Sequence, residues 1–430
     1  MSRTRWSTSV IVGALSIALA VLAGCSNSRG TQADNDAAPG VSATEIKVGS
    51  IADVTGILSS DFGPVVKGVE AYFSMIDAEG GVAGRKLNLA YQEDDQGSPE
   101  QNYTAAQTLV ERDHAFAVVG VATPFFNGAT YLAQQGTPTF GYVASTDWRG
   151  HPTLFGDYGS VLCFSCAVPD NAYTAQQLGA MSVGVLAYGV PQSAAACGAW
   201  ATGMHQFGVN VSFTDLSFAF GSDPTADVLK MKSADVDLLV TCLDVVGNVN
   251  VARALAQNGM NIKQEWFNGY DRSTLQQYAP IMQGVYFNLQ HVPFESAAAY
   301  PGVYPGLETY IREMEKYQPA STFSEIALDG WVAADQFVTG LKAIGNGALT
   351  QRAVVDAINK ETAFTAHGLT DPVDWTTAHD TAGSPSCLAS VSVQGDAFVP
   401  AFVQGAHGVF NCFNAGSTMP VAPKPGTPGT

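Results

Sequence analysis

The stretch EIKVGSIADVTGILSSDFGPVVKGVEAYFSMIDAEGGVAGRKLNLAYQ, residues 45–92, changes its hydrophobic period twice. Residues 45–52 have the apolar content of a strand, and residues 63–78 carry apolar side chains at helical spacing. Residues 86–92 are predicted to form a second strand. A strand, a helix and a strand in this order predict a βαβ unit, in which the two strands are parallel.

The turn inside this stretch, EGGVAGRKL at Glu79–Leu87, raises the alternative of a phosphate-binding loop. A P-loop has the spacing GxxxxGK[ST] and opens a helix. Here the magnesium-binding hydroxyl is missing at Leu87, and the glycines follow a predicted helix. Gly80 and Gly81 are therefore expected to end the helix and turn the chain into the next strand.

Alternation of strands and helices continues along the chain and then restarts. A helix opened by Ser98 and Pro99 is predicted over residues 98–113, followed by strands at 115–120 and 138–143. A second run of the same kind extends from residue 171 to residue 270. The chain from about residue 292 is mainly helical before strands return near 387–403. Two such runs predict an α/β fold with two lobes, each a parallel sheet between helices.

The N-terminus indicates export. Arg3 and Arg5 precede an apolar run of signal-peptide length that ends in LAGC, Leu22–Cys25. This pattern predicts a lipoprotein signal peptide at 1–24 and lipidation of Cys25, although an ordinary signal peptide with a chance cysteine is the alternative. A flexible tether is expected at 25–43 and a disordered tail at 414–430, because both are rich in small residues, proline and glycine.

Composition and charge exclude some classes of protein. Apolar residues make up 46% of the 430 residues and charged residues 13%, which is typical of a globular chain. Residues 1–24 hold two basic residues and no acidic one, so the remaining chain has a net charge of −20. Nucleic acid is not an expected partner, because its phosphates require a basic face.

Six cysteines remain after Cys25, which suggests three disulfides in an exported protein. Fifteen pairings are possible. Cys387 and Cys412 flank a hairpin-like segment, which favours pairing them, and a helix start can meet a strand end between Cys197 and Cys242. Cys163 and Cys166 are left as the third pair, because a zinc site would need a second pair of ligands that is not evident.

Ligands of open α/β sheets bind beyond the carboxyl ends of the strands. Six loops of the predicted fold have this position and form the candidate binding site, as two sets that face each other. They are residues 52–58, 121–128, 143–150, 187–195, 243–248 and 268–273.

The sequence resembles a known family. A helix ending in GGxxGR at Gly80–Arg85, then a strand, then the acidic pair Asp94–Asp95 before the helix opened by Pro99, is similar to the opening lobe of type I periplasmic binding proteins. The closer resemblance is to the leucine/isoleucine/valine-binding branch of ABC-importer receptors, over most of residues 43–413.

This resemblance implies two Rossmann-like lobes joined by a hinge that the chain crosses three times. Lobe 1 is expected at 44–160, returning at about 292–362, and lobe 2 at 161–291, returning at about 363–413. It also implies a lipid-tethered, extracytoplasmic receptor that passes a solute to a membrane permease with its ATPase subunits. A monomer is expected.

The resemblance further implies where the solute is held. In the first lobe the implied contacts are Thr123, Phe125, Phe126, Ala144, Ser145 and Thr146. In the second lobe they are Gln192, Ser193, Tyr270 and Asp271. Hydroxyls at Ser145 and Thr146 suit a carboxylate, Asp271 suits an amine, and the two phenylalanines suit a more aromatic solute than a branched-chain amino acid.

Packing roles are possible for several of these residues. Phe125 and Phe126 can cap the core instead of touching a solute, and Asp271 can serve as the N-cap of the following helix. No catalytic constellation, metal motif or cofactor motif is apparent, so an exported enzyme ranks below a solute receptor. A ligand-sensing lipoprotein ranks between these two, and a structural lipoprotein ranks last.

Overall fold

The computed structural model describes residues 38–162, 169–381, 387–406, 408–414, 416–422 and 427–429. Residues 38–430 form one compact unit. Residues 1–37 lie outside the described part, and so do the predicted signal peptide, Cys25, most of the tether, Cys163 and Cys166. Among the described residues, no helix combines the length and apolar character needed to cross a membrane.

The first lobe is built on a five-stranded sheet whose neighbouring strands pair in parallel, in the order β2-β1-β3-β4-β5. Its strands are β1 (Glu45–Ala52), β2 (Lys86–Asp94), β3 (Val118–Ala122), β4 (Thr139–Gly141) and β5 (Leu154–Gly156). Its helices are α1 (Ser59–Phe62), α2 (Val65–Ala78), α3 (Pro99–Gln107) and α4 (Ala129–Gln135), with shorter helical turns at Thr108–Arg112 and Thr146–Trp148.

The predicted opening βαβ unit is confirmed. Helix α2 ends at Ala78, and Gly80 and Gly81 follow with φ angles of 107° and 74°, a region that favours glycine. A Cβ atom on Gly81 would lie 2.1 Å from the Arg85 carbonyl oxygen, so this turn requires glycine. The next helix begins as expected, because Ser98 caps α3 and Pro99 is its first residue.

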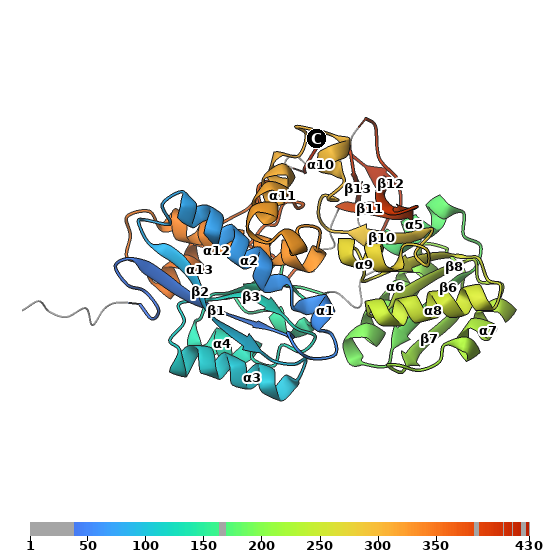
Figure 1. Ribbon diagram of the computed structural model, residues 1–430, viewed down its shortest axis with the longest axis horizontal. Coiled ribbons are helices and arrows are strands. Elements are labelled where there is room, and N and C mark those ends of the chain that lie inside the picture. The colour runs from blue at the N-terminus through green and yellow to red at the C-terminus, as the bar shows by residue number, and fades with distance from the viewer. Residues whose placement is uncertain are drawn as a thin grey trace, which may run out of the picture. The chain divides into compact units, whose positions relative to one another are not determined.

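Later helices return to the first lobe. They are α10 (Ser296–Ala299), α11 (Pro305–Tyr317), α12 (Glu325–Ile344) and α13 (Gln351–Ile358), with a short turn at Pro319–Ser321. Helix α12, orange in Figure 1, packs beside the blue α2. Gly68 and Gly330 allow this crossing, because a Cβ at either position would fall within 2 Å of a backbone oxygen of the facing helix: 1.8 Å for Gly68 and 1.9 Å for Gly330.

The second lobe is built on a nine-stranded sheet in the order β14-β13-β11-β10-β9-β8-β6-β7, with β12 paired to β11. Strands β6 to β10 pair in parallel, and pairing from β10 through β14 is antiparallel. The strands are β6 (Val183–Tyr188), β7 (Val211–Phe218), β8 (Leu238–Cys242), β9 (Lys263–Trp266), β10 (Val285–Leu289), β11 (Cys387–Gln394), β12 (Ala397–Ala401), β13 (Phe410–Phe413) and β14 (Pro420–Val421).

Helices accompany the parallel part of this sheet, as Figure 1 shows for α6 and α8. They are α5 (Asp170–Leu178), α6 (Pro191–Gln206), α7 (Thr225–Ser233), α8 (Val245–Gln257) and α9 (Arg272–Tyr278). The chain passes between the two sheets three times, after β5, after β10 and after α13. Strand β14 lies inside the segment that was expected to be a disordered tail.

Two of the predicted disulfides are confirmed, and both lie in the second lobe. Cys197 of α6 is bonded to Cys242 at the end of β8, and Cys387 of β11 is bonded to Cys412 of β13. The second bond joins residues that are directly opposite each other in an antiparallel pair. Each disulfide therefore closes a loop of the chain within the second lobe.

Candidate functional site

Exposed apolar side chains lie in the loops that follow parallel strands and in the first turn of α8. In the first lobe these are Val54 and Ile57 after β1, and Ile57 exposes 77% of its surface. In the second lobe they are Phe220 after β7, Val246 after β8 and Phe267 after β9, the last two exposed by 56% and 45%. Exposed apolar side chains at the carboxyl ends of both sheets are typical of a surface that binds an apolar ligand.

The loop after β1 is held in shape by two carboxylates, the buried Asp53 and the partly exposed Asp94. Asp53 accepts hydrogen bonds from the backbone N–H groups of Gly56 at 2.6 Å and Leu58 at 3.2 Å. Asp94 at the end of β2 accepts from the Thr55 hydroxyl at 2.5 Å and from the Val54 N–H at 3.0 Å. These bonds fix the backbone on both sides of Val54 and leave the apolar side chains of the loop exposed.

Carboxylates from both lobes lie close enough to repel one another. Burial, followed by repulsion from Asp244 and Asp53, raises the pKa of Asp61 to about 7. Asp61 belongs to α1 of the first lobe, whereas Asp244 precedes α8 in the second. The polar part of this region therefore favours hydrogen-bond donors or a positive charge over a second anion.

Asp244 is positioned by an aromatic residue of the neighbouring strand. The Tyr188 hydroxyl donates to Asp244 Oδ1 at 2.5 Å, and burial raises the pKa of Tyr188 above its usual value. The Tyr188 ring stacks on Phe220, with the ring centroids 3.8 Å apart. This stack covers one face of the Phe220 ring, and 40% of the Phe220 surface remains exposed.

The first-lobe residues implied by the family resemblance divide between surface and core. The Thr123 hydroxyl is within 3.3 Å of both the N–H and the carbonyl oxygen of Phe125, so it holds the loop after β3. Phe125 is partly exposed. Phe126 is buried and packs on Trp148 with ring centroids 4.8 Å apart, so this residue has the packing role instead.

The loop after β4 uses its serine internally. The Ser145 hydroxyl donates to Asp147 Oδ2 at 2.8 Å, and its oxygen faces the Asp147 N–H at 3.4 Å as the cap of a short helical turn. A carboxylate beside this hydroxyl disfavours an anionic ligand group at the same place. Thr146 is exposed and Ala144 is partly exposed, so these two residues remain at the surface.

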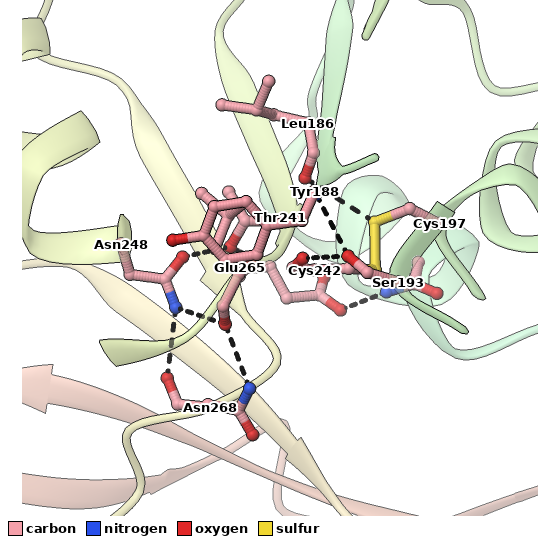
Figure 2. Close-up of a disulfide and its surroundings, with 11 residues drawn as sticks. Leu186, Tyr188, Ser193, Cys197, Thr241, Cys242, Asn248, Glu265 and Asn268 are labelled. Carbon is pink, nitrogen blue, oxygen red and sulfur yellow. Dashed lines mark hydrogen bonds between the residues drawn. A yellow bond between two sulfur atoms is a disulfide. The ribbon is translucent and has the colours of Figure 1, made fainter. Parts of the chain in front are cut away.

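Ser193 stabilises the second lobe from within, as Figure 2 shows. Its hydroxyl donates to the Cys242 carbonyl at 2.5 Å and accepts from the Tyr188 N–H at 3.1 Å. The hydroxyl therefore ties the start of α6 to the ends of β6 and β8, next to the Cys197–Cys242 bond. Gln192, its neighbour, has a buried Oε1 atom with no hydrogen-bond partner.

Tyr270 and Asp271 are also engaged by the protein. Tyr270 is buried, and its hydroxyl donates to Glu295 Oε2 at 2.6 Å and accepts from the Phe294 N–H at 2.8 Å. Asp271 caps α9, accepting from the N–H groups of Ser273 at 2.7 Å and Thr274 at 3.1 Å. The capping role is therefore confirmed for Asp271.

The exposed apolar residues lie in segments that the sequence predicts as strand-end loops, but the sequence did not single out these residues. Val54 and Ile57 lie in the predicted loop 52–58, and Val246 lies in the predicted loop 243–248. The available signal was an apolar side chain placed directly after a strand in a loop that otherwise has turn residues. Among the described residues, no group of histidine, cysteine and acidic side chains has the arrangement of a metal site.

Comparison with known proteins identifies the architecture. A family model described as "Periplasmic binding protein" matches residues 45–397. No curated protein sequence matches the chain. Several solved structures share the fold at low sequence identity.

One such structure is a fatty acid ABC transporter substrate-binding protein from Thermomonospora curvata, with 17% identity, a TM-score of 0.70, and coverage of 90% of this chain and 97% of the other. A second is a branched-chain amino acid ABC transporter protein from Thermus thermophilus with bound valine, with 16% identity, a TM-score of 0.69, and coverage of 84% and 96%.

A third is the solute-binding protein of an ABC transporter from R. palustris in complex with benzoate, with 14% identity, a TM-score of 0.68, and coverage of 86% and 98%. At these identities the structures establish the fold, whereas the family model covers most of the sequence. The chain belongs to the type I periplasmic binding protein family.

Proposed function

We propose that this protein is the extracytoplasmic solute receptor of an ABC importer and that it captures a small solute with an apolar or aromatic body. The observation that carries the proposal is the set of exposed apolar side chains at the carboxyl ends of both sheets, above all Ile57, Val246 and Phe267. A solute that buries these side chains gains about 25 cal/mol for each Å² of apolar surface removed from water.

Three structurally similar proteins support the choice of solute. Their names or bound ligands point to a fatty acid, valine and benzoate, each of which combines a carboxylate with an apolar body. In this chain the carboxylates of Asp61 and Asp244 add a preference for a donor-bearing end, such as the amine of an amino acid. An amino-acid-like compound with an apolar or aromatic body is therefore the first candidate solute, and an aromatic carboxylate is the second.

The proposed mechanism is closure of the two lobes on the solute. The chain crosses between the sheets three times, and a solute that contacts loops of both lobes stabilises the closed state by its greater affinity for that state. The closed receptor then delivers the solute to a permease coupled to ATPase subunits. Lipidation of Cys25 would hold the receptor at the membrane as a monomer.

A binding screen tests the proposal. Residues 38–430, which form one compact unit, are assayed by thermal shift and calorimetry against valine, leucine, phenylalanine, benzoate and octanoate. A true solute at 100 times its dissociation constant adds about 2.7 kcal/mol of stability. A sugar or nucleotide panel that binds while all five of these compounds fail would contradict the proposed solute class.

A further inference from the structure

A cavity lies within the second lobe, on the side of the sheet that carries α5 and α6. It has a volume of about 70 Å³ and is lined by the start of α5, the middle of α6 and the ends of β9 and β10. A single water needs roughly 10–15 Å³ of such space, so the cavity admits a group of about five non-hydrogen atoms.

Three hydrogen-bond acceptors in this cavity have no donor. Glu265 is only 3% exposed, and its Oε1 accepts from Asn288 Nδ2 at 2.9 Å and from Asn171 Nδ2, while its Oε2 has no partner. Asn171 is 2% exposed, and its Oδ1 also has no partner. The third is Asp170 Oδ1, at the first residue of α5. Buried acceptors without donors are rare and costly, so once Glu265 is ionised this set calls for a ligand that donates.

Aromatic rings complete the lining. Trp200 of α6 and Phe267 lie with ring centroids 5.6 Å apart, and both border the cavity together with Trp266. The Trp266 N–H donates to Gln264 Oε1 at 3.1 Å, so this residue offers only its ring. Aromatic faces beside carboxylates attract cations, and they do so more strongly in a desolvated site.

We propose that this cavity binds a small organic cation with N–H donors, of the size of methylammonium. The ammonium group donates to Glu265 Oε2, Asn171 Oδ1 and Asp170 Oδ1, and its methyl group contacts the aromatic rings. The three N–H groups of the occupant would satisfy all three acceptors, and its single positive charge would offset one of the two carboxylate charges. Phe267 borders this cavity and is also one of the exposed apolar residues of the proposed solute-binding surface.

The protonation of Glu265 and Asp170 sets the pH range in which the cavity binds a cation. Burial, then repulsion from Asp170, raises the pKa of Glu265 to about 8, and burial raises the pKa of Asp170 to about 6. These are the titratable side chains that line the cavity: α5 and β9 contribute one each, and α6, β10 and β11 contribute uncharged residues. Binding should therefore be stronger at pH 8.5 than at pH 5.5.

Calorimetry with methylammonium chloride tests the site at pH 8.5 and pH 5.5. Potassium and tetramethylammonium chloride serve as controls at equal ionic strength, because neither carries an N–H donor. We expect saturable binding of methylammonium that is weaker at pH 5.5, with little or no binding of the two controls. Equal binding of potassium or tetramethylammonium would overturn the proposal, and so would no binding of methylammonium.

Variants distinguish methylammonium binding in this cavity from a general effect of salt. Glu265→Gln keeps the shape of the protonated acid and should weaken methylammonium binding roughly tenfold or more, the loss expected for a charge-assisted bond. Glu315→Gln, at an exposed position of α11, is the matched control and should change nothing. Asp170→Asn provides a second test if the first variant does not fold. Unchanged binding in a folded Glu265 or Asp170 variant would overturn the proposal.

Discussion

The proposed solute-binding loops and the cavity of the second lobe occupy similar positions at the carboxyl ends of strands but differ in chemistry. The loops present exposed apolar side chains, and their polar groups are mostly bonded within the protein, as at Ser193, although Gln192 Oε1 is buried without a partner. The cavity does the reverse, because Glu265 and Asn171 are buried with acceptor atoms left unpaired. Position at a strand end therefore predicts where a ligand can bind, whereas the unpaired groups indicate which ligand.

The largest expected effect comes from the disulfide that lies beside both regions. Cys197 is on α6, which carries Trp200 of the cavity, and Cys242 precedes the loop of Asp244 and Val246. Replacing both cysteines by alanine opens a loop of 45 residues and should lower the free energy of unfolding by about 3–4 kcal/mol. Urea denaturation of residues 38–430 measures this change.

The same double variant should weaken ligand binding in both regions, since one cross-link supports both. If stability falls while a bound solute and methylammonium keep their affinities, the disulfide supports the lobe but neither site.

A second variant should affect the solute-binding loops alone. Ile57→Ala with Val246→Ala removes apolar contact from the loop after β1 and from the first turn of α8, and the affinity for an apolar solute should fall by about 2 kcal/mol. Both side chains are exposed, so stability of the free protein should change little. Calorimetry with the tightest compound of the solute screen gives the result, and Leu229→Ala, an exposed position on α7, serves as the control.

The pH dependence of stability should distinguish the two regions further. The folded-state pKa values of Asp61 and Glu265, about 7 and about 8, lie above the ordinary values of 3.8 and 4.5. Each group therefore contributes stability that is fully present below its ordinary pKa and is lost as the pH rises through its folded pKa. Melting temperatures should fall across pH 4–7 from Asp61 and across pH 4.5–8 from Glu265.

Neutral variants check this assignment. Asp61→Asn should reduce the fall in melting temperature between pH 4 and pH 7, and Glu265→Gln should reduce the fall between pH 4.5 and pH 8. Each change should amount to about one to a few degrees. Identical pH profiles in the wild type and both variants would show that neither acid has the stated shift.

The smallest effect is expected at Ser145. Its hydroxyl is committed to Asp147, so Ser145→Ala should change solute affinity by less than about 0.5 kcal/mol. Calorimetry with the same solute provides the measurement. A loss of about 1–2 kcal/mol would instead indicate that this hydroxyl leaves Asp147 and holds the solute, as the family resemblance implies.

These differences explain what the sequence could predict. The βαβ order, the caps at Ser98 and Asp271 and the two disulfides were predictable, because each depends on local period or on nearby strand and helix ends. The role of Ser193 was not, since its hydroxyl bonds to the carbonyl of Cys242, 49 residues further along the chain. The exposure of Ile57 could not be predicted either, because the sequence does not show whether an apolar loop residue faces the core or the solvent.

The central claim is that an apolar solute binds at the strand-end loops of both lobes. The most direct test is calorimetric titration of residues 38–430 with valine, benzoate and octanoate, using the wild type and the Ile57→Ser, Val246→Ser double variant. We predict that at least one compound binds the wild type with a negative heat-capacity change, the mark of apolar burial, and binds the variant at least about tenfold more weakly. Equal affinity for the two proteins would contradict the claim.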